Sequence, residues 1–345
     1  MSNPLRLIRY GLRVRELCLI AALASVSACG GAHTLAPLTS PPLAAGPIAW
    51  MSPSQARDAR TIARWRTAVG SPLVSTNPAH GASVPVDAIT VVSWNVALDG
   101  GDVVRLVRGL EAQAPGRPIV LLLQEVFRSG DDVPSSRAEA LFAAHLGGCS
   151  REREIDDVAR ALGFSLYYVP SMRNGAPGHH EDRGNAVLSS MPLADLAAIE
   201  LPFERQRRVA VAATVRGRTS GGESWSLRLA SVHLDNLVGA RHGWIATEYG
   251  RARQARGLRE ALAGDDPMVL AGDFNTWFGF ADKAYLETAL AFPQTRVDDR
   301  RRTFRGLLRL DHVFYRLRPG WHAGVRRAES ALGSDHYPLI TTIAF

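Results

Sequence analysis

Short apolar runs that stop at a polar residue recur along the chain after residue 86. Residues 89–95 are rich in β-branched side chains and end at an asparagine, and residues 118–125 form a continuous apolar run that ends at an acid. Such runs are typical of strands buried on both faces. Residues 102–113 between them have apolar side chains at helical spacing. The pattern predicts a domain that opens strand, helix, strand.

The same two periods continue to the C-terminus. Strands are predicted at 165–169, 185–189, 208–215, 226–233, 267–272, 310–315 and 339–344. Helices are predicted at 138–146, 152–162, 243–263 and 281–290. Many strands with helices between them indicate one layered domain of the α/β or α+β class, with no internal repeat.

Polar side chains with chemical potential follow these apolar runs. Ligands bind where strand ends converge on one rim of a layered sheet, and buried acids and imidazoles are costly unless they are paired or bind a metal. Any one such residue alone is more often an ordinary turn residue. The recurrence at so many strand ends predicts one site, formed by Asn95, Glu125, His233, Asp273, Asn275, Asp311, His312, Asp335 and His336.

The N-terminus has the pattern of an export signal. Residues 1–15 are basic without an acid, and residues 17–28 are apolar to small and shorter than the roughly 20 residues that span a bilayer. Val26-Ser27-Ala28-Cys29 resembles the lipobox of bacterial lipoproteins, which implies acylation of Cys29 after removal of residues 1–28. Since Gly30 follows, we favour the outer membrane. An ordinary cleaved signal and an uncleaved anchor are the alternatives.

Residues 29–85 are predicted to be a tether. The stretch from residue 30 to 53 is uncharged and rich in Ala, Pro, Gly, Ser and Thr, so it cannot bury a core, and a short basic helix is predicted at 54–68. The catalytic domain is then expected over residues 86–345. The net charge of +7 favours anionic partners only modestly, and the three cysteines show no zinc-like spacing.

Seven ordered motifs resemble those of the endonuclease/exonuclease/phosphatase family, which includes deoxyribonuclease I, neutral sphingomyelinases and inositol polyphosphate phosphatases. They are Ser-Trp-Asn-Val at 93–96, Leu-Gln-Glu-Val at 123–126, Gly-Asn-Ala-Val-Leu-Ser at 184–189, Ser-Val-His-Leu at 231–234, Gly-Asp-Phe-Asn at 272–275, Leu-Asp-His-Val at 310–313 and Ser-Asp-His-Tyr-Pro at 334–338. The resemblance implies an α+β four-layered sandwich, two mixed β-sheets packed face to face with helices outside.

The resemblance also implies a role for each matching residue. Glu125 would be the principal metal ligand, with Asn95 and Asp335 near the metal. His336 would be the general base and Asp311 the acid that orients it. Asp273 would handle a proton or water, Asn275 would orient an oxygen, and His233 would contact the phosphate or protonate the leaving oxygen. Asn185 lies in a matching segment, and Arg183 beside it is a candidate phosphate ligand.

This set of residues suits hydrolysis of a phosphate ester. A phosphodiester is anionic and repels hydroxide, so a hard cation such as Mg²⁺ or Mn²⁺, held by oxygen ligands, would neutralise charge and orient the substrate. An imidazole can take a proton near neutral pH, and a carboxylate on its other nitrogen fixes the tautomer.

The substrate class stays open between alternatives. We expect a monomeric phosphodiesterase outside the cytoplasm, with DNA or RNA as the first substrate, because the chain has a modest excess of arginine, and phospholipid second. Both classes stay open because nucleases and lipid hydrolases share the core motifs and differ in their loops. A lipid phosphodiesterase or phosphatase, like a sphingomyelinase or phosphoinositide phosphatase, is favoured by the membrane tether. A surface binding protein without catalysis is the alternative from another class.

Overall fold

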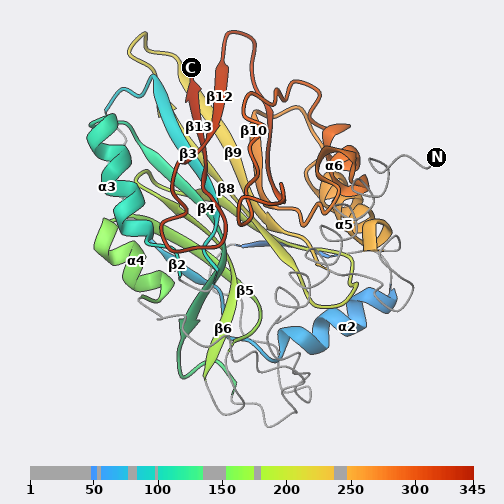
Figure 1. The fold of residues 1–345 in the computed structure, drawn as a ribbon. Coiled ribbons are helices and arrows are strands. Elements are labelled where there is room, and N and C mark those ends of the chain that lie inside the picture. The colour runs from blue at the N-terminus through green and yellow to red at the C-terminus, as the bar shows by residue number, and fades with distance from the viewer. Residues whose placement is uncertain are drawn as a thin grey trace, which may run out of the picture.

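In a computed structural model of the 345-residue chain, the described residues are 48–52, 56–76, 84–97, 100–134, 153–174, 180–236 and 247–345. They form two mixed β-sheets packed face to face with helices outside (Figure 1). The first sheet has the order β1 (Ala49–Met51), β7 (Ala194–Glu200), β8 (Val209–Arg218), β9 (Ser224–His233), β10 (Met268–Asp273) and β11 (Asp311–Arg316). This is the α+β sandwich that the sequence predicts.

The second sheet has seven strands. Its order is β12 (His322–Arg327), β13 (Leu339–Ala344), β3 (Ala88–Asn95), β4 (Ile119–Ser129), β6 (Glu181–Ser189), β5 (Ser165–Arg173) and β2 (Leu73–Ser75). Both sheets contain parallel and antiparallel pairs, with β3 parallel to β4 and β9 parallel to β10. These two parallel pairs place the ends of four strands at the same edge of the sandwich.

Helices cover both outer faces. On the second sheet lie α3 (Val103–Gln113) and α4 (Ile155–Leu162), and on the first lie α5 (Thr247–Ala261) and α6 (Lys283–Ala289), which follows the short η3 (Gly279–Ala281) (Figure 1). The Asp102 side chain caps α3 by accepting from Arg105 N. No helix in the described part of the chain is long and apolar enough to cross a membrane.

Apolar side chains form three buried layers that match this arrangement. The layer between the sheets combines residues such as Leu122 and Val187 with Val211 and Leu229. A second layer packs the second sheet against α3 and α4, and a third packs the first sheet against α5 and α6. Because β3 and β4 are buried on both faces, their sequences show continuous apolar runs.

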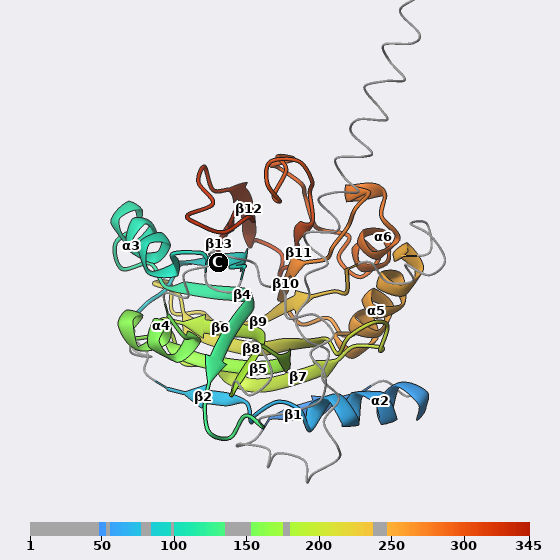
Figure 2. The same cartoon turned by 60° about the horizontal axis from the view of Figure 1, so that its bottom comes forward.

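The described part of the segment that we expected to be a tether belongs to the fold. Its described residues 48–52 and 56–75, called here the N-terminal strap, contribute β1, β2 and α2 (Ala56–Arg66) along one side of the sandwich (Figure 2). β1 pairs with β7 of the first sheet and β2 with β5 of the second. Trp65 is buried, and Arg66 forms an ion pair with Glu200 at 2.9 Å. Among the described residues, folded elements therefore begin at residue 49, ahead of the boundary expected at residue 86.

Two predictions from the sequence concern residues outside the described ranges. They are the expected signal segment with Cys29, at residues 1–28 and 29, and the helix expected at 138–146. Four strands were not expected, namely β1, β2, β7 and β12. Three of them lie at sheet edges, and β7 becomes an inner strand only because β1 pairs with it.

Candidate active site

Three polar side chains form a row across neighbouring strands of the first sheet. The register pairs Asp273, the last residue of β10, with His233 of β9 on one side and with Asp311 of β11 on the other. All three residues are buried. His233 Nε2 lies 3.5 Å from Asp273 Oδ2. The apolar strands thus end in a closely spaced row of titratable groups.

The second sheet completes the site from the opposite side. Asn95, at the end of β3, donates from Nδ2 to Asp273 Oδ2 at 3.0 Å. His336, from the segment before β13, donates from Nδ1 to Asp311 Oδ2 at 2.8 Å, and its Nε2 lies 3.8 Å from Asp273 Oδ2. One oxygen of Asp273 therefore faces Asn95, His233 and His336 together.

Two site residues have left-handed backbone conformations that side chains other than glycine seldom adopt. Glu125 has φ +56° at a bulge where β4 shifts register between Gln124 and Val126. Its Oε1 lies 3.8 Å from His233 Nδ1, and 29% of its side chain is exposed. Asn275 has φ +50°, and its backbone N donates to Asp273 Oδ1 at 2.8 Å. Such strain persists where the surroundings hold it and clusters at functional sites.

The backbone of His336 is held by residues of β3. Trp94 Nε1 donates to His336 O at 2.9 Å. Ser334 Oγ accepts from His336 N at 2.9 Å and donates to Asn95 O at 2.7 Å. These bonds fix the loop against the strand that carries Asn95, so the position of the imidazole depends on the second sheet.

Burial and charge move the pKa values of the three central groups in different directions. Burial raises the pKa of Asp273 to about 7, with His336 opposing the shift and Asp311 reinforcing it. Burial lowers the pKa of His336, but Asp311, Asp273 and Asp335 outweigh it and raise the value to about 10. Burial, followed by the charges of Arg208, His336 and Arg183, lowers the pKa of His233 well below its usual value. The surroundings therefore favour a cationic His336 beside a neutral His233.

The remaining predicted residues lie around this centre, except His312. The expectation that His312 belongs to the site is wrong: it follows Asp311 on β11 and so faces the other side of the strand, where its Nε2 contacts Thr276 Oγ1 at 2.7 Å and its ring packs against Phe274 and Tyr285. Asp335 Oδ1 is 3.9 Å from His336 Nε2, and its other oxygen pairs with Arg305 at 3.3 Å. Asn185 donates from Nδ2 to Val209 O at 2.7 Å, so its amide joins the two sheets. Arg183 is buried close enough to act on the charge of His233. Asn275 also donates from Nδ2 to Leu234 O at 2.9 Å.

Three supporting residues were not found from the sequence. Trp94 and Ser334 lie inside the motifs Ser-Trp-Asn-Val and Ser-Asp-His-Tyr-Pro, and their place in a motif is the signal that could have found them. Arg208 follows two other arginines in residues 204–208. This basic stretch fits a plain charged turn as well as it fits a contact with a nucleic-acid backbone or an anionic lipid surface. The role of Arg208 depends on Asp235, which accepts from its Nε at 3.2 Å.

The donor set fits a hard divalent cation. Ligand atoms of Asp273, Asp311 and His336 lie within 4.8 Å of one another, and Asp311 Oδ1 is buried without a hydrogen-bond partner among the described residues. The strained backbone of Glu125 presents a partly exposed carboxylate to the same group. Oxygen ligands with few competing donors suit Mg²⁺ or Mn²⁺. The ligands predicted from the sequence, Glu125, Asn95 and Asp335, are a different set, and their role stays a prediction.

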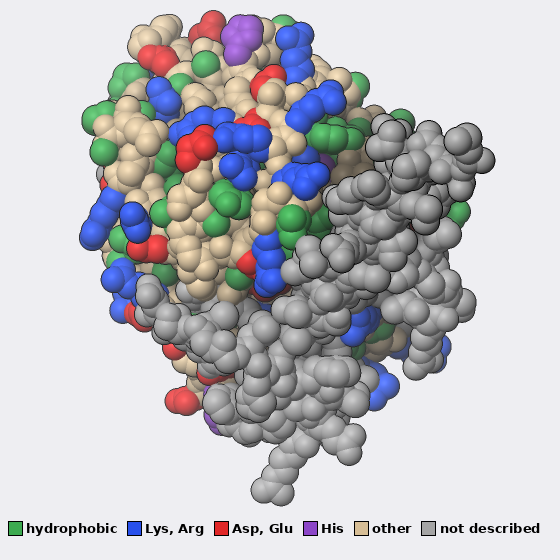
Figure 3. Space-filling view, in the orientation of Figure 1, with side chains coloured by type: hydrophobic (Ala, Val, Ile, Leu, Met, Phe, Trp, Pro, Cys, Tyr) green, Lys and Arg blue, Asp and Glu red, His purple; other side chains and the backbone are tan. Residues whose placement is uncertain are grey.

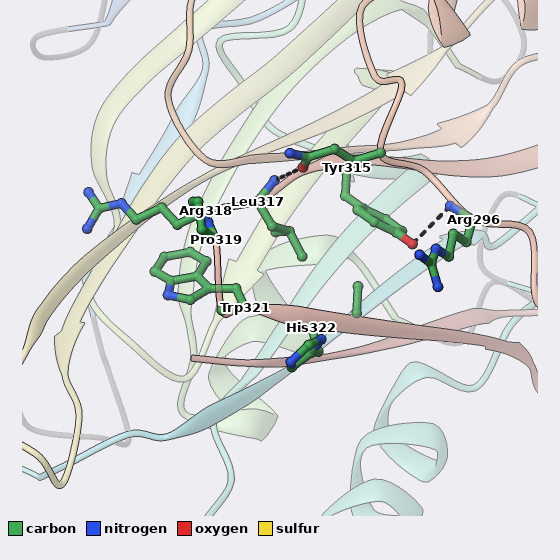
Figure 4. A pocket seen from close by; sticks show the side chains of 10 residues that line it. Arg296, Tyr315, Leu317, Arg318, Pro319, Trp321 and His322 are labelled. Atoms are coloured by element: carbon green, nitrogen blue, oxygen red, sulfur yellow. Dashed lines mark hydrogen bonds between the residues drawn. The ribbon is translucent and has the colours of Figure 1, made fainter.

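A separate pocket of about 380 Å³ lies at the far end of β11 and the start of β12 (Figure 4). Tyr315 lines this pocket, and its OH accepts a hydrogen bond from Arg296 N at 2.9 Å. The Arg318 guanidinium lies 5.5 Å from the Trp321 ring. Because Asp311 begins β11 at the opposite end, this pocket is not part of the catalytic group.

The chain is similar to known proteins in sequence and in fold. A model of the endonuclease/exonuclease/phosphatase family matches residues 92–336, a span that contains Asn95, Glu125, His233, Asp273 and His336. The chain belongs to this family. Members of the endonuclease/exonuclease/phosphatase family are hydrolases that act on phosphoester bonds, typically with a divalent metal ion. The family includes nucleases, phosphatases and sphingomyelinases.

Solved structures of family members share the fold. A family protein from Beutenbergia cavernae has 21% identity, a TM-score of 0.50, and coverage of 75% of this chain and 72% of its own. One from Leptotrichia buccalis has 15% identity and a TM-score of 0.50, and covers 74% of this chain and 100% of its own. At such identity the likeness concerns the fold alone.

A curated UPF0294 protein of Vibrio cholerae matches a shorter stretch. It is 42% identical over 78 residues, which are 21% of this chain and 26% of that protein. The match thus spans about a quarter of the length of the relative.

Proposed function

We propose that the protein is a metal-dependent phosphodiesterase that acts outside the cytoplasm, with a nucleic acid as its first candidate substrate. The observation that carries this proposal is the convergence of Asn95, His233 and His336 on one oxygen of Asp273, with Asp311 bound behind His336. A carboxylate between two imidazoles, beside the carboxylate of Glu125, is suited to bind an anionic phosphate and to activate water next to it.

The roles of Asp273 and His336 follow from their neighbours. His336 is surrounded by the carboxylates of Asp311, Asp273 and Asp335, which stabilise its cationic form and suit it to bind a phosphate oxygen. Buried Asp273 is the better proton acceptor for the attacking water, because its pKa of about 7 suits a general base near neutral pH. This division of roles differs from the expectation that His336 is the base.

Other residues prepare the site for this step. The backbone N–H of Asn275 holds Asp273 Oδ1, which leaves Oδ2 toward the histidines. His233, neutral and buried, faces both Glu125 and Asp273, where it can contact the phosphate or the leaving oxygen. A divalent ion held at Glu125 would act as a Lewis acid that neutralises charge on the phosphate.

A lipid substrate is the second candidate, and one observation favours it. Phe278, three residues after Asn275 and before η3, is 50% exposed, as expected of an aromatic side chain that contacts lipid. The arginine and lysine side chains on the face in Figure 3 are interspersed with acidic ones, which gives the nucleic-acid reading only modest support.

The test is hydrolysis by the fragment that begins at residue 48. Bis-p-nitrophenyl phosphate, plasmid DNA, RNA and sphingomyelin would be compared in Mg²⁺, Mn²⁺ and EDTA. We expect metal-dependent turnover that is lost in Glu125→Gln and Asp273→Asn and kept in His322→Ala, since His322 is exposed at the opposite end. Metal-independent turnover, or none of any substrate, would refute the proposal and favour a binding protein.

We further propose that Cys29, when acylated, anchors the protein to a membrane. The motif Val26-Ser27-Ala28-Cys29 supports it. Fractionation of the full chain and of Cys29→Ser would test it, because a variant that still fractionates with membranes would rule out acylation of Cys29 as the anchor.

A further inference from the structure

Arg183 lies at the end of the space between the two sheets that adjoins the active site. Side chains of alternate strand residues share a face. On β6, Val187 belongs to the buried layer between the sheets, and Asn185 reaches Val209 of the first sheet. Arg183 is the next residue on that face toward the strand end, and it pairs in register with Phe127 of β4. Its guanidinium therefore lies near Glu125 and His233.

The Arg183 guanidinium has no carboxylate partner in the part of the chain that the structure describes. The residue is only 7% exposed, and among the described residues its side chain makes one hydrogen bond, from Nη2 to the sulfur of Met172 at 3.3 Å. Burial lowers its pKa, and the charge of Glu125 only partly opposes this. An unpaired buried charge is costly. The charge of Glu125 reaches this guanidinium, but no described carboxylate forms an ion pair with it, so its donors are available to an anion from outside the protein.

Arg208 provides a second cation beside the first. Asp235, which is buried, accepts from Arg208 Nε and also from the backbone N–H groups of Arg205 and Gln206. This anchors one edge of the Arg208 guanidinium. Arg208 and Arg183 both lower the pKa of His233, and each acts on the other as a like charge. Their proximity is unfavourable until an anion lies between or beside them.

Arg207 shows how this fold treats an arginine whose role is structural. It is buried even more deeply than Arg183. Its Nε and Nη2 both donate to Glu200 Oε1, at 3.1 and 2.7 Å, and its Nη1 donates to Pro170 O and Ser171 O. Each of its nitrogens is bonded. The contrast shows that the lack of partners at Arg183 is not a general feature of buried arginines in this chain.

We propose that Arg183 and Arg208 bind a second phosphate of the substrate, next to the phosphate that is cleaved. Guanidinium groups present paired donors that match phosphate oxygens. This inference rests on the proposed function, because it assigns the scissile phosphate to Asp273 and His336. The preferred substrate is then a phosphate ester with a neighbouring phosphate, either a terminal one or the next along a polynucleotide.

The test compares the dinucleotide dTpdT with pdTpdT and dTpdTp, which carry a 5′- or 3′-terminal phosphate. Binding would be measured by calorimetry in EDTA, and kcat and KM in Mg²⁺. We expect one of the phosphorylated dinucleotides to bind about tenfold more tightly than dTpdT. Adding this terminal phosphate to dTpdT should lower KM by a larger factor than it raises kcat, because the second phosphate is bound equally in the ground and transition states.

Arg183→Met and Arg208→Met should abolish this preference, while Arg205→Met, a neighbouring control whose backbone N–H alone contacts Asp235, should keep it. Equal binding of all three dinucleotides, or an unchanged preference in Arg183→Met, would overturn the inference. Both results leave the proposed function standing if bis-p-nitrophenyl phosphate is hydrolysed. Conversely, a preference in EDTA without any hydrolysis would support the phosphate subsite and refute the phosphodiesterase.

Discussion

Replacing Trp94 by Phe tests whether the second sheet positions His336 for the proposed reaction. The change removes the bond from Trp94 Nε1 to His336 O, in which both residues are buried. A buried carbonyl left without a donor costs about 1–3 kcal/mol, and the smaller ring costs about 1–2 kcal/mol more, compared with ~3–5 kcal/mol for a whole aromatic side chain. The total of about 2–5 kcal/mol, at about 2–4 °C per kcal/mol, should lower Tm by roughly 4–20 °C.

The chain contains a matched control for this change. Trp225 Nε1 donates to Val86 O at 3.1 Å and the residue is buried, but it lies eight positions before His233 on β9, ~26 Å away at ~3.3 Å per residue. Trp225→Phe should lower Tm similarly and leave kcat/KM unchanged. Trp94→Phe, assayed well below its Tm, should lower kcat/KM about tenfold, or ~1.4 kcal/mol. Equal kcat/KM values for the two variants would refute the positioning role.

Three further changes test the packing and charges of the fold. A β-carbon at Gly272, where φ is +156°, would lie 1.8 Å from Val232 O, so Gly272→Ala should melt far below the parent protein; an unchanged melting curve would contradict the crowding. In EDTA, the folded pKa of His336, about 10, exceeds its usual value near 6.5. The difference in unfolding free energy between the parent protein and His336→Gln should therefore be largest below pH 6.5 and disappear as the pH rises through 10. Urea unfolding at several pH values would measure it, and a difference that grows with pH would contradict the raised pKa. Arg251→Leu leaves Asp282 buried without its 2.8 Å partner and should cost ~3–5 kcal/mol, and the added change Asp282→Asn should recover part of it; no recovery would show that the pair is uncoupled.

The central strands were predictable because their burial leaves a mark in the sequence. β3 and β4 are covered on both faces, so their apolar runs are continuous and end where the strands end. β7 lacks such a mark, since its Ala-Asp-Leu-Ala-Ala-Ile-Glu sequence has little β-branching. β12 is a short polar edge strand. The identity of these strands depends on partners that are distant in the sequence, which local propensity cannot reveal.

The sequence predicted which residues form most of the site, and it did not predict the contacts between them. Strand ends located Asn95, His233 and Asp273, because a sheet gathers such ends at one edge. The sequence does not show that one oxygen of Asp273 faces three of these groups. Nor does it show which arginines have partners, since Arg207 and Arg208 are adjacent in the chain yet bind different acids, Glu200 and Asp235.

The N-terminal strap also has a consequence for the order in which the chain can fold. Its strands are synthesised first, but Leu73 pairs with Tyr168 and Ala49 with Ala197, so neither strand has a partner until much of the chain has left the ribosome. Contacts so distant in sequence form late. Until then β5 and β7 present unpaired backbone edges, which promote association between chains. A chain that begins at residue 86 would keep both edges permanently, and we expect it to aggregate even though every catalytic residue is present.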